Sequence, residues 1–120
     1  MLKKIRLELA RTGGGATGDA AVAYQITAPL DRAGRLDAEG WRAHRDKCVV
    51  IHAMPGAAAD RGLLIRTADN QWALSYGPGV DRDEPTRLLR SHAFRVEGYV
   101  SISDRDGRSL PFKVVSIADA

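Results

Sequence analysis

Four side chains of this 120-residue chain have the chemistry of metal ligands or nucleophiles: His44, Cys48, His52 and His92. Cys48 and His52 lie four residues apart, a spacing that brings two ligands together on a helix but leaves them about 13 Å apart along a strand. The β-branched run at 49–51 favours a strand, and His44 would meet Cys48 only if a helix continued through Cys48. We therefore expect no metal site, with each histidine at the surface or rim.

Nucleophilic catalysis would have to use a pair formed by Cys48 and His92. Cys48 lies in an apolar run, where burial raises the pKa of a thiol and makes it inert. Neither a third orienting group nor an oxyanion hole is evident nearby, and no two carboxylates share an apolar setting. The sequence predicts no catalytic residue, so an enzyme remains open only through residues that are far apart in the sequence.

A glycine-rich stretch at 13–18, Gly-Gly-Gly-Ala-Thr-Gly, matches the dinucleotide fingerprint G-x-G-x-x-G. That chemistry needs a helix N-terminus facing the pyrophosphate, whereas the residues that follow alternate like a strand. No glycine is followed by lysine, so the Walker pattern is absent. We interpret the stretch as a hairpin loop and expect no cofactor.

Arg66, Trp72 and Tyr76 are the candidate ligand-binding residues. Trp72 and Tyr76 fall on one face of an expected strand, with Arg66 across a hairpin. Aromatic rings flanked by arginine hold single strands or small ligands on small barrels. Leu74 lies between the two rings, which favours packing in the core as the simpler interpretation.

The formal net charge is +3, and it comes from the N-terminal segment. Lys3, Lys4, Arg6 and Arg11 face only Glu8 there, whereas basic and acidic residues alternate elsewhere. These four side chains would be the electrostatic arm of a single-stranded RNA binder. Interleaved charge is instead typical of a solvated surface, so nucleic acid is possible but not favoured.

The elements that must position these residues are mostly strands. Period-two alternation or compact apolar runs indicate strands at 4–11, 21–28, 48–51 and 87–90, and hairpins at 62–77 and 99–117. Asp37 is the expected N-cap of one short helix near 38–46. The pattern predicts one mainly β domain over residues 1–120, a small antiparallel β-barrel or barrel-like sandwich of about seven or eight short strands. With no apolar run long enough for a membrane span and no signal peptide, we expect a cytoplasmic protein.

Two stretches carry a family resemblance. One runs from Gly62 through Trp72 to Pro85, and the other from Phe94 to Ile117. Together they resemble a family of small, uncharacterised bacterial proteins about one barrel long, and the resemblance implies the fold but no activity. The strand at 98–102 is also similar to the flavin-side barrel of ferredoxin-reductase-like enzymes, although the Arg-x-Tyr-Ser segment of those enzymes is missing.

These observations favour a non-enzymatic interaction module that binds a protein partner or a second copy. The N-terminal strand, with an unpaired edge, would be a natural site for homodimer pairing. A barrel that binds a small ligand, such as a flavin or nucleotide, and a single-stranded RNA binder are the alternatives.

Overall fold

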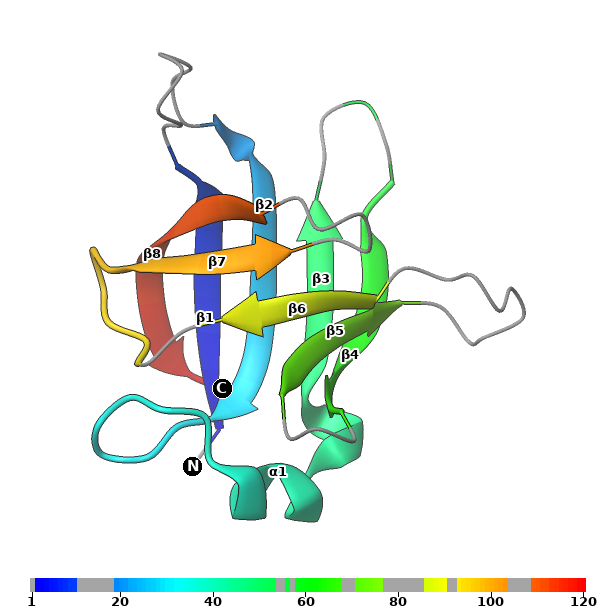
Figure 1. The fold of residues 1–120 in the computed structure, drawn as a ribbon, viewed down its shortest axis with the longest axis vertical. Helices are drawn as coiled ribbons and strands as arrows, with labels where there is room; N and C mark the ends of the chain where they lie inside the picture. The colour runs from blue at the N-terminus through cyan, green and yellow to red at the C-terminus, as the bar shows by residue number, and fades with distance from the viewer. Residues whose placement is uncertain are drawn as a thin grey trace.

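Eight antiparallel strands close into a barrel in the computed structural model, which describes residues 2–10, 19–53, 56, 58–67, 71–76, 86–90, 93–103 and 109–120 (Figure 1). Each strand pairs with the next along the chain, and the last pairs with the first. The strands are β1 (Leu2–Leu9), β2 (Asp19–Pro29), β3 (Val49–Ala53), β4 (Asp60–Arg66), β5 (Trp72–Tyr76), β6 (Thr86–Arg90), β7 (Tyr99–Ser103) and β8 (Ser109–Asp119). The mainly β barrel predicted from the alternating segments is confirmed.

Closure of the barrel depends on β1, which pairs with β2 on one side and with β8 on the other. The ladder to β8 shifts register between Arg6 and Leu7, and the ladder to β2 shifts between Glu8 and Leu9. Such bulges increase local twist and bend a strand, which helps a sheet to close on itself. The expectation of an unpaired edge on the N-terminal strand is therefore wrong: both edges of β1 are used within the chain.

The core fills the inside of the barrel. Inward side chains alternate with outward ones along the strands, as Ile5 and Leu7 do on β1 and as Val100 and Ile102 do on β7, and all four are buried. The buried cluster draws on all eight strands, on α1 and on the segments just before β3 and β7: Ile5, Leu7, Tyr24, Ile26, Ala28, Trp41, Cys48, Val50, Leu64, Leu74, Leu89, Phe94, Val100, Ile102, Phe112 and Val114. The interior of the barrel is therefore packed with side chains.

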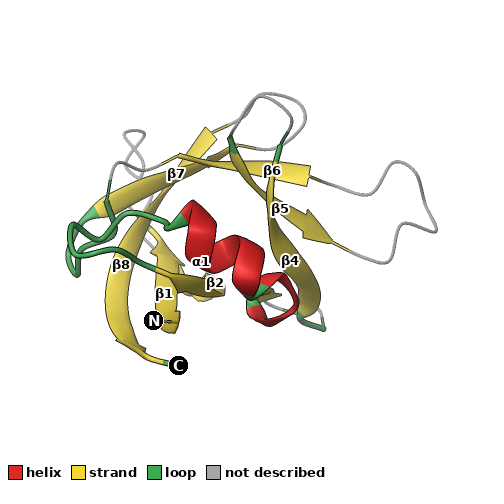
Figure 2. Ribbon diagram, turned by 90° about the horizontal axis from the view of Figure 1, so that it is seen from below, coloured by secondary structure: helices red, strands yellow, loops and turns green. Residues whose placement is uncertain are grey.

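One short helix, α1 (Ala38–Ala43), lies across one end of the barrel, followed by the 3-10 turn η1 (Arg45–Lys47). Figure 2 views the molecule from this end and shows α1 in front of the strands. The carboxylate of Asp37 caps the helix by accepting the backbone N–H of Glu39 at 3.1 Å. The predicted cap and helix position are confirmed, although the α-helix ends at Ala43 instead of continuing to residue 46.

The segment between β2 and α1 packs against the segment before β7. Gly34 has φ of +82°, and its carbonyl accepts the backbone N–H of Phe94 at 2.7 Å. A Cβ at Gly34 would lie 2.7 Å from the carbonyl oxygen of Phe94, which is closer than side chains approach. This contact ties the chain around α1 to the barrel end and requires glycine at position 34. Within the described ranges, no helix has the length and apolar character needed to cross a bilayer.

Candidate functional site

Two tryptophans meet where α1 covers the barrel. The rings of Trp41 on α1 and Trp72 at the start of β5 contact edge to face, with centroids 5.6 Å apart and planes at 86°. Trp41 is only 9% exposed, and its indole Nε1–H donates to the carbonyl of Leu64 on β4 at 2.8 Å. Trp41 thus fixes α1 to the barrel wall while Trp72 remains half-buried beside it.

An arginine lies on each of these rings. The guanidinium carbon of Arg45 is 5.0 Å from the centroid of Trp41, and that of Arg66 is 4.6 Å from the centroid of Trp72. Arg66 and Trp72 are direct partners across the β4–β5 ladder, while Arg45 lies in the turn after α1. We name these four residues, Trp41, Arg45, Arg66 and Trp72, the Arg–Trp cluster.

The arginines of the Arg–Trp cluster have no carboxylate partner among the described residues. The ion pairs there join other side chains: Lys3 with Asp119, Arg6 with Glu8 and Lys113 with Glu97. Arg45 is exposed and Arg66 half-buried. A guanidinium on an aromatic face keeps its N–H edge free and held in a fixed plane, so it can receive a planar anion through two hydrogen bonds.

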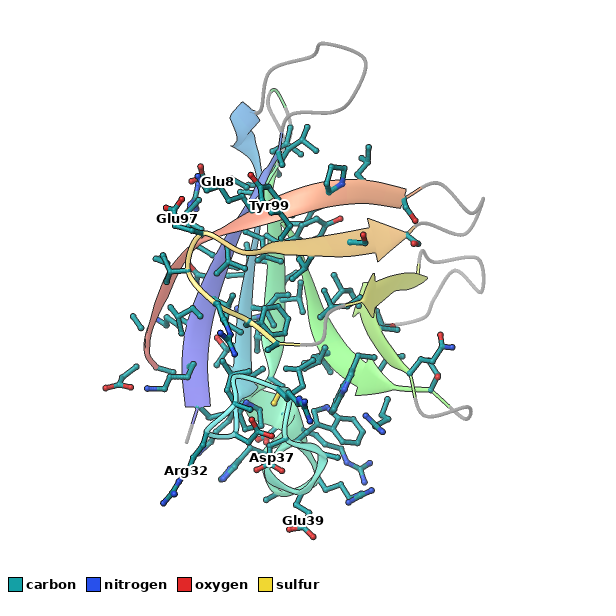
Figure 3. The ribbon with its side chains drawn as sticks, turned by 60° about the vertical axis from the view of Figure 1, so that its left-hand side comes forward. Glu8, Arg32, Asp37, Glu39, Glu97 and Tyr99 are labelled. Atoms are coloured by element: carbon teal, nitrogen blue, oxygen red, sulfur yellow. The ribbon has the colours of Figure 1, made fainter. Side chains whose placement is uncertain are left out.

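Cations predominate around Arg45. Arg42 and Lys47 are exposed in α1 and η1, with Asp46 between Arg45 and Lys47 and with Glu39 in the first turn of the helix. Figure 3 shows Glu39 at the outer tip of this end, with Asp37 and Arg32 also at this end of the molecule. The surface around the Arg–Trp cluster is therefore mixed in charge, and the two arginines of the cluster itself lie on its rings.

Of the three candidate ligand-binding residues, the structure brings Arg66 and Trp72 together. Tyr76 lies at the other end of β5, paired with Gly62, and its side chain lies outside the described residues. Trp41 and Arg45 were not among the site residues predicted from the sequence. No local signal relates them to Arg66 and Trp72, because Arg45 lies in η1 beyond the end of α1 and the contact between Trp41 and Trp72 is tertiary.

Two of the four cations of the proposed electrostatic arm are paired with carboxylates. Lys3 pairs with Asp119, and Arg6 Nε donates to Glu8 at 2.8 Å. Lys4 is exposed on β1, and Arg11 lies outside the described residues, as does the glycine-rich stretch. The segment after that stretch is the strand β2, which confirms that it does not open a nucleotide-binding helix.

The expectation that every histidine lies at the surface is wrong for His52. It is 5% exposed and stacks on Tyr24 of the neighbouring strand, with ring centroids 4.1 Å apart and planes at 4°. Tyr24 in turn contacts Phe112 edge to face. His52 is inside because it shares the inward face of β3 with Val50. His44 is exposed as expected, and His92 lies outside the described residues.

Cys48 is fully buried just before β3. Burial raises the pKa of its thiol, and the nearby charge of Asp46 raises it further. Across the described parts of the chain, no three His, Cys, Asp or Glu side chains gather in a way that could hold a metal ion. The thiol therefore has the surroundings of a structural residue.

A second surface feature lies on the flank of the barrel, where Glu8, Glu97 and Tyr99 gather in Figure 3. In the backbone register, Lys113 lies opposite Glu8 on β1 and opposite Tyr99 on β7. Its Nζ forms an ion pair with Glu97 at 2.8 Å. Tyr99 is 65% exposed. The charged groups here are already matched to one another, so the feature offers one exposed ring and no unmatched charge.

Comparison with protein families, curated proteins and solved structures gives no match. The resemblance to a family of small bacterial proteins, and the similarity to the flavin-side barrel, therefore stay predictions. What this chain does must be argued from its own geometry.

Proposed function

We propose that this chain is a non-enzymatic interaction module that binds a protein partner through the Arg–Trp cluster. One observation carries the proposal: Arg45 and Arg66 lie on tryptophan rings at the barrel end and have no carboxylate partner in the described part of the chain. Tryptophan and arginine are the residues that most often dominate binding energy at protein interfaces. The ring contacts hold both arginines in place before a partner arrives, which lowers the entropy lost on binding.

The packed interior supports a surface function over a ligand held in the lumen. His52 and Tyr24 stack inside the barrel, and Cys48 is buried near its covered end. A flavin or nucleotide needs a cavity of several hundred cubic ångströms. Of the three residues that the small-ligand alternative names, Arg66, Trp72 and Tyr76, the first two contact each other.

Single-stranded RNA has less support than a protein partner. Binding by base stacking needs an exposed ring face, and Trp41 is 9% exposed with Arg45 over its ring. Trp72 has Arg66 over its ring. The N-terminal cations that would form the electrostatic arm include Lys3 and Arg6, both of which are paired with carboxylates.

Self-association is a second candidate because of the exposed ring on the flank. Tyr99 is 65% exposed and Val96, three residues earlier, is 50% exposed. Since β1 is paired on both edges, a second copy would dock through side chains instead of extending the sheet. Native mass spectrometry of the purified chain tests this candidate: a dimer that Tyr99→Ser dissociates supports it, and a strict monomer at high micromolar concentration refutes it.

A charge-matched capture experiment tests the main proposal. The wild type, an Arg45→Gln/Arg66→Gln variant and a control variant are cross-linked in a lysate of the organism that encodes the chain. The control is Lys4→Gln/Arg61→Gln, which removes two exposed cations elsewhere on the barrel. We expect a defined partner that the wild type and the control retain and that the Arg45/Arg66 variant loses. Equal capture by all three proteins would refute the proposed site.

A further inference from the structure

We infer that the partner segment bound by the Arg–Trp cluster is an acidic peptide, with carboxylates received by the guanidinium groups of Arg45 and Arg66. The inference rests on the proposed function and specifies its partner. It follows from three features of the barrel end: the two arginines lack carboxylate partners among the described residues, further cations surround them, and the two indole rings differ in exposure.

The arginines are the first feature. Lys3, Arg6 and Lys113 each have a carboxylate within the chain, whereas Arg45 and Arg66 have none among the described residues. A guanidinium presents five donors in a rigid fork that matches the two oxygens of a carboxylate. The guanidinium carbons lie 5.0 Å and 4.6 Å from the indole centroids, and each guanidinium has the donors for a bidentate pair with a carboxylate.

The surrounding charges are the second feature. Arg42 on α1 and Lys47, in η1 with Arg45, are exposed and add positive potential next to the cluster. Glu39 and Asp46 interrupt that potential. A regular row of phosphates would meet these two carboxylates, whereas a peptide can place its acidic residues at chosen positions and neutral ones between them.

The rings are the third feature. Trp41 is almost buried, donates its N–H to Leu64 and carries Arg45 on its ring. Its role is to hold the guanidinium and not to accept a nucleobase. Trp72 is half-buried under Arg66, so it adds apolar contact area at the edge of the site. A short acidic peptide with apolar residues between its carboxylates fits both the arginines and the Trp72 ring: its carboxylates pair with the guanidinium groups, and its apolar side chains cover the edge of the indole.

NMR titration of the isotope-labelled full chain tests the inference. The probes are a twelve-residue peptide of alternating glutamate, leucine and glycine, the same peptide with glutamine in place of glutamate, and a single-stranded oligouridine. We expect the glutamate peptide to shift the Nε–H signals of Arg45, Arg66 and Trp72 in a saturable manner that weakens with salt. We expect the glutamine peptide to cause no saturable shift.

Two pairs of variants separate specific recognition from general attraction. Arg45→Gln/Arg66→Gln should weaken binding of the glutamate peptide by about tenfold or more, because charge-assisted hydrogen bonds are lost. Lys4→Gln/Arg61→Gln removes the same charge and should change affinity less than about twofold. Arg45→Lys/Arg66→Lys keeps the charge but lacks the planar fork, so it should also weaken binding. Unchanged thermal melting of these surface variants verifies that they are folded.

Each outcome decides between the two proposals. Equal binding of the glutamate and glutamine peptides, or an equal loss in the control variant, overturns the inference. Tighter binding of oligouridine at Arg45 and Arg66 replaces the acidic peptide with nucleic acid. Capture of a partner that depends on Arg45 and Arg66, without any shift from the glutamate peptide, keeps the proposed function and refutes the acidic partner. Failure of both experiments refutes both.

Discussion

Replacing Trp41 with phenylalanine tests whether this indole fastens α1 to the barrel. Phenylalanine retains an aromatic ring but cannot donate to the carbonyl of Leu64, which accepts Trp41 Nε1–H at 2.8 Å. Leaving a buried acceptor without its donor costs about 1–3 kcal/mol, and the smaller ring leaves unfilled volume that costs about 1 kcal/mol more. We expect the free energy of unfolding to fall by about 2–4 kcal/mol, with a loss of roughly 10 °C in Tm.

Trp72→Phe is the matched control. The Trp72 indole contacts Trp41 and Arg66 but has no hydrogen-bond acceptor in the described part of the chain, so its loss should cost about 1 kcal/mol. Urea denaturation followed by circular dichroism measures both variants. The chain has two tryptophans, so each variant also retains a single fluorescent indole that reports on the barrel end.

The comparison between the two variants tests whether the hydrogen bond from Trp41 to Leu64 fastens α1 to the barrel. If Trp41→Phe is no less stable than Trp72→Phe, then the hydrogen bond to Leu64 does not fasten the helix, and Arg45 is not held in place by a fixed ring. If Trp41→Phe melts earlier by several degrees and Trp72→Phe does not, then the buried setting of Trp41 and its hydrogen bond to Leu64 account for the difference, because both substitutions remove the same atoms.

Three further predictions concern the backbone, the thiol and the ends of the chain. Gly34→Ala should lower the free energy of unfolding, measured in urea, by about 1–3 kcal/mol, because φ is +82° and a Cβ would meet a carbonyl oxygen at 2.7 Å. Gly56→Ala, where φ is +75° but the space around a Cβ is open, should lower it less. Cys48 is buried and its thiol pKa is raised, so Ellman's reagent should react with it only after unfolding, and rapid reaction of the native protein would refute this. Lys3 lowers the pKa of Asp119 below its ordinary value of 3.8, so this pair stabilises the fold at neutral pH and its contribution is lost as pH falls through the lowered pKa. A carbon-13 titration of the carboxylate should show that midpoint, and Asp119→Asn should remove the pair at every pH.

The strands could be predicted because each carries its own signal. Ile5 and Leu7 alternate with charged residues, and the inward face of β1 follows directly from that alternation. The face of β3 could not be predicted in this way. Val49, Val50 and Ile51 are all apolar, so the sequence does not say which face enters the core, and the burial of His52 depends on that choice.

The barrel was predicted as a fold class, but the pairing of β1 with β8 that closes it could not be predicted, because the paired residues lie far apart in the sequence. Ile5 pairs with Ile117, and Lys3 pairs with Asp119, near opposite ends of the chain. No local pattern reports such a pairing; it depends on the twist accumulated over all the strands between them. The N-terminal strand considered by itself therefore suggested an unpaired edge, whereas in the complete sheet that edge of β1 pairs with β8.

Two of the four residues of the Arg–Trp cluster could be predicted from the sequence. Arg66 and Trp72 belong to one hairpin, whose register a short loop determines, so their contact follows from local sequence. The positions of Trp41 and Arg45 against them depend on how a helix docks on a barrel, which is a tertiary property. The helix cap at Asp37 predicted the helix without predicting the surface that it covers.

Stability and binding are coupled at the Arg–Trp cluster. Trp41 closes one end of the barrel through its hydrogen bond to Leu64, and the same ring supports Arg45. A partner that binds Arg45 and Arg66 together therefore contacts both η1, directly after α1, and the β4–β5 hairpin, so a bound partner opposes separation of this helical segment from the barrel. A ligand that binds only the folded state raises apparent stability. An acidic peptide should therefore protect the indole N–H of Trp41 from hydrogen exchange once the peptide concentration exceeds the Kd of the complex. Protection confined to Arg45 or to Arg66 would show that the helix and the hairpin bind independently.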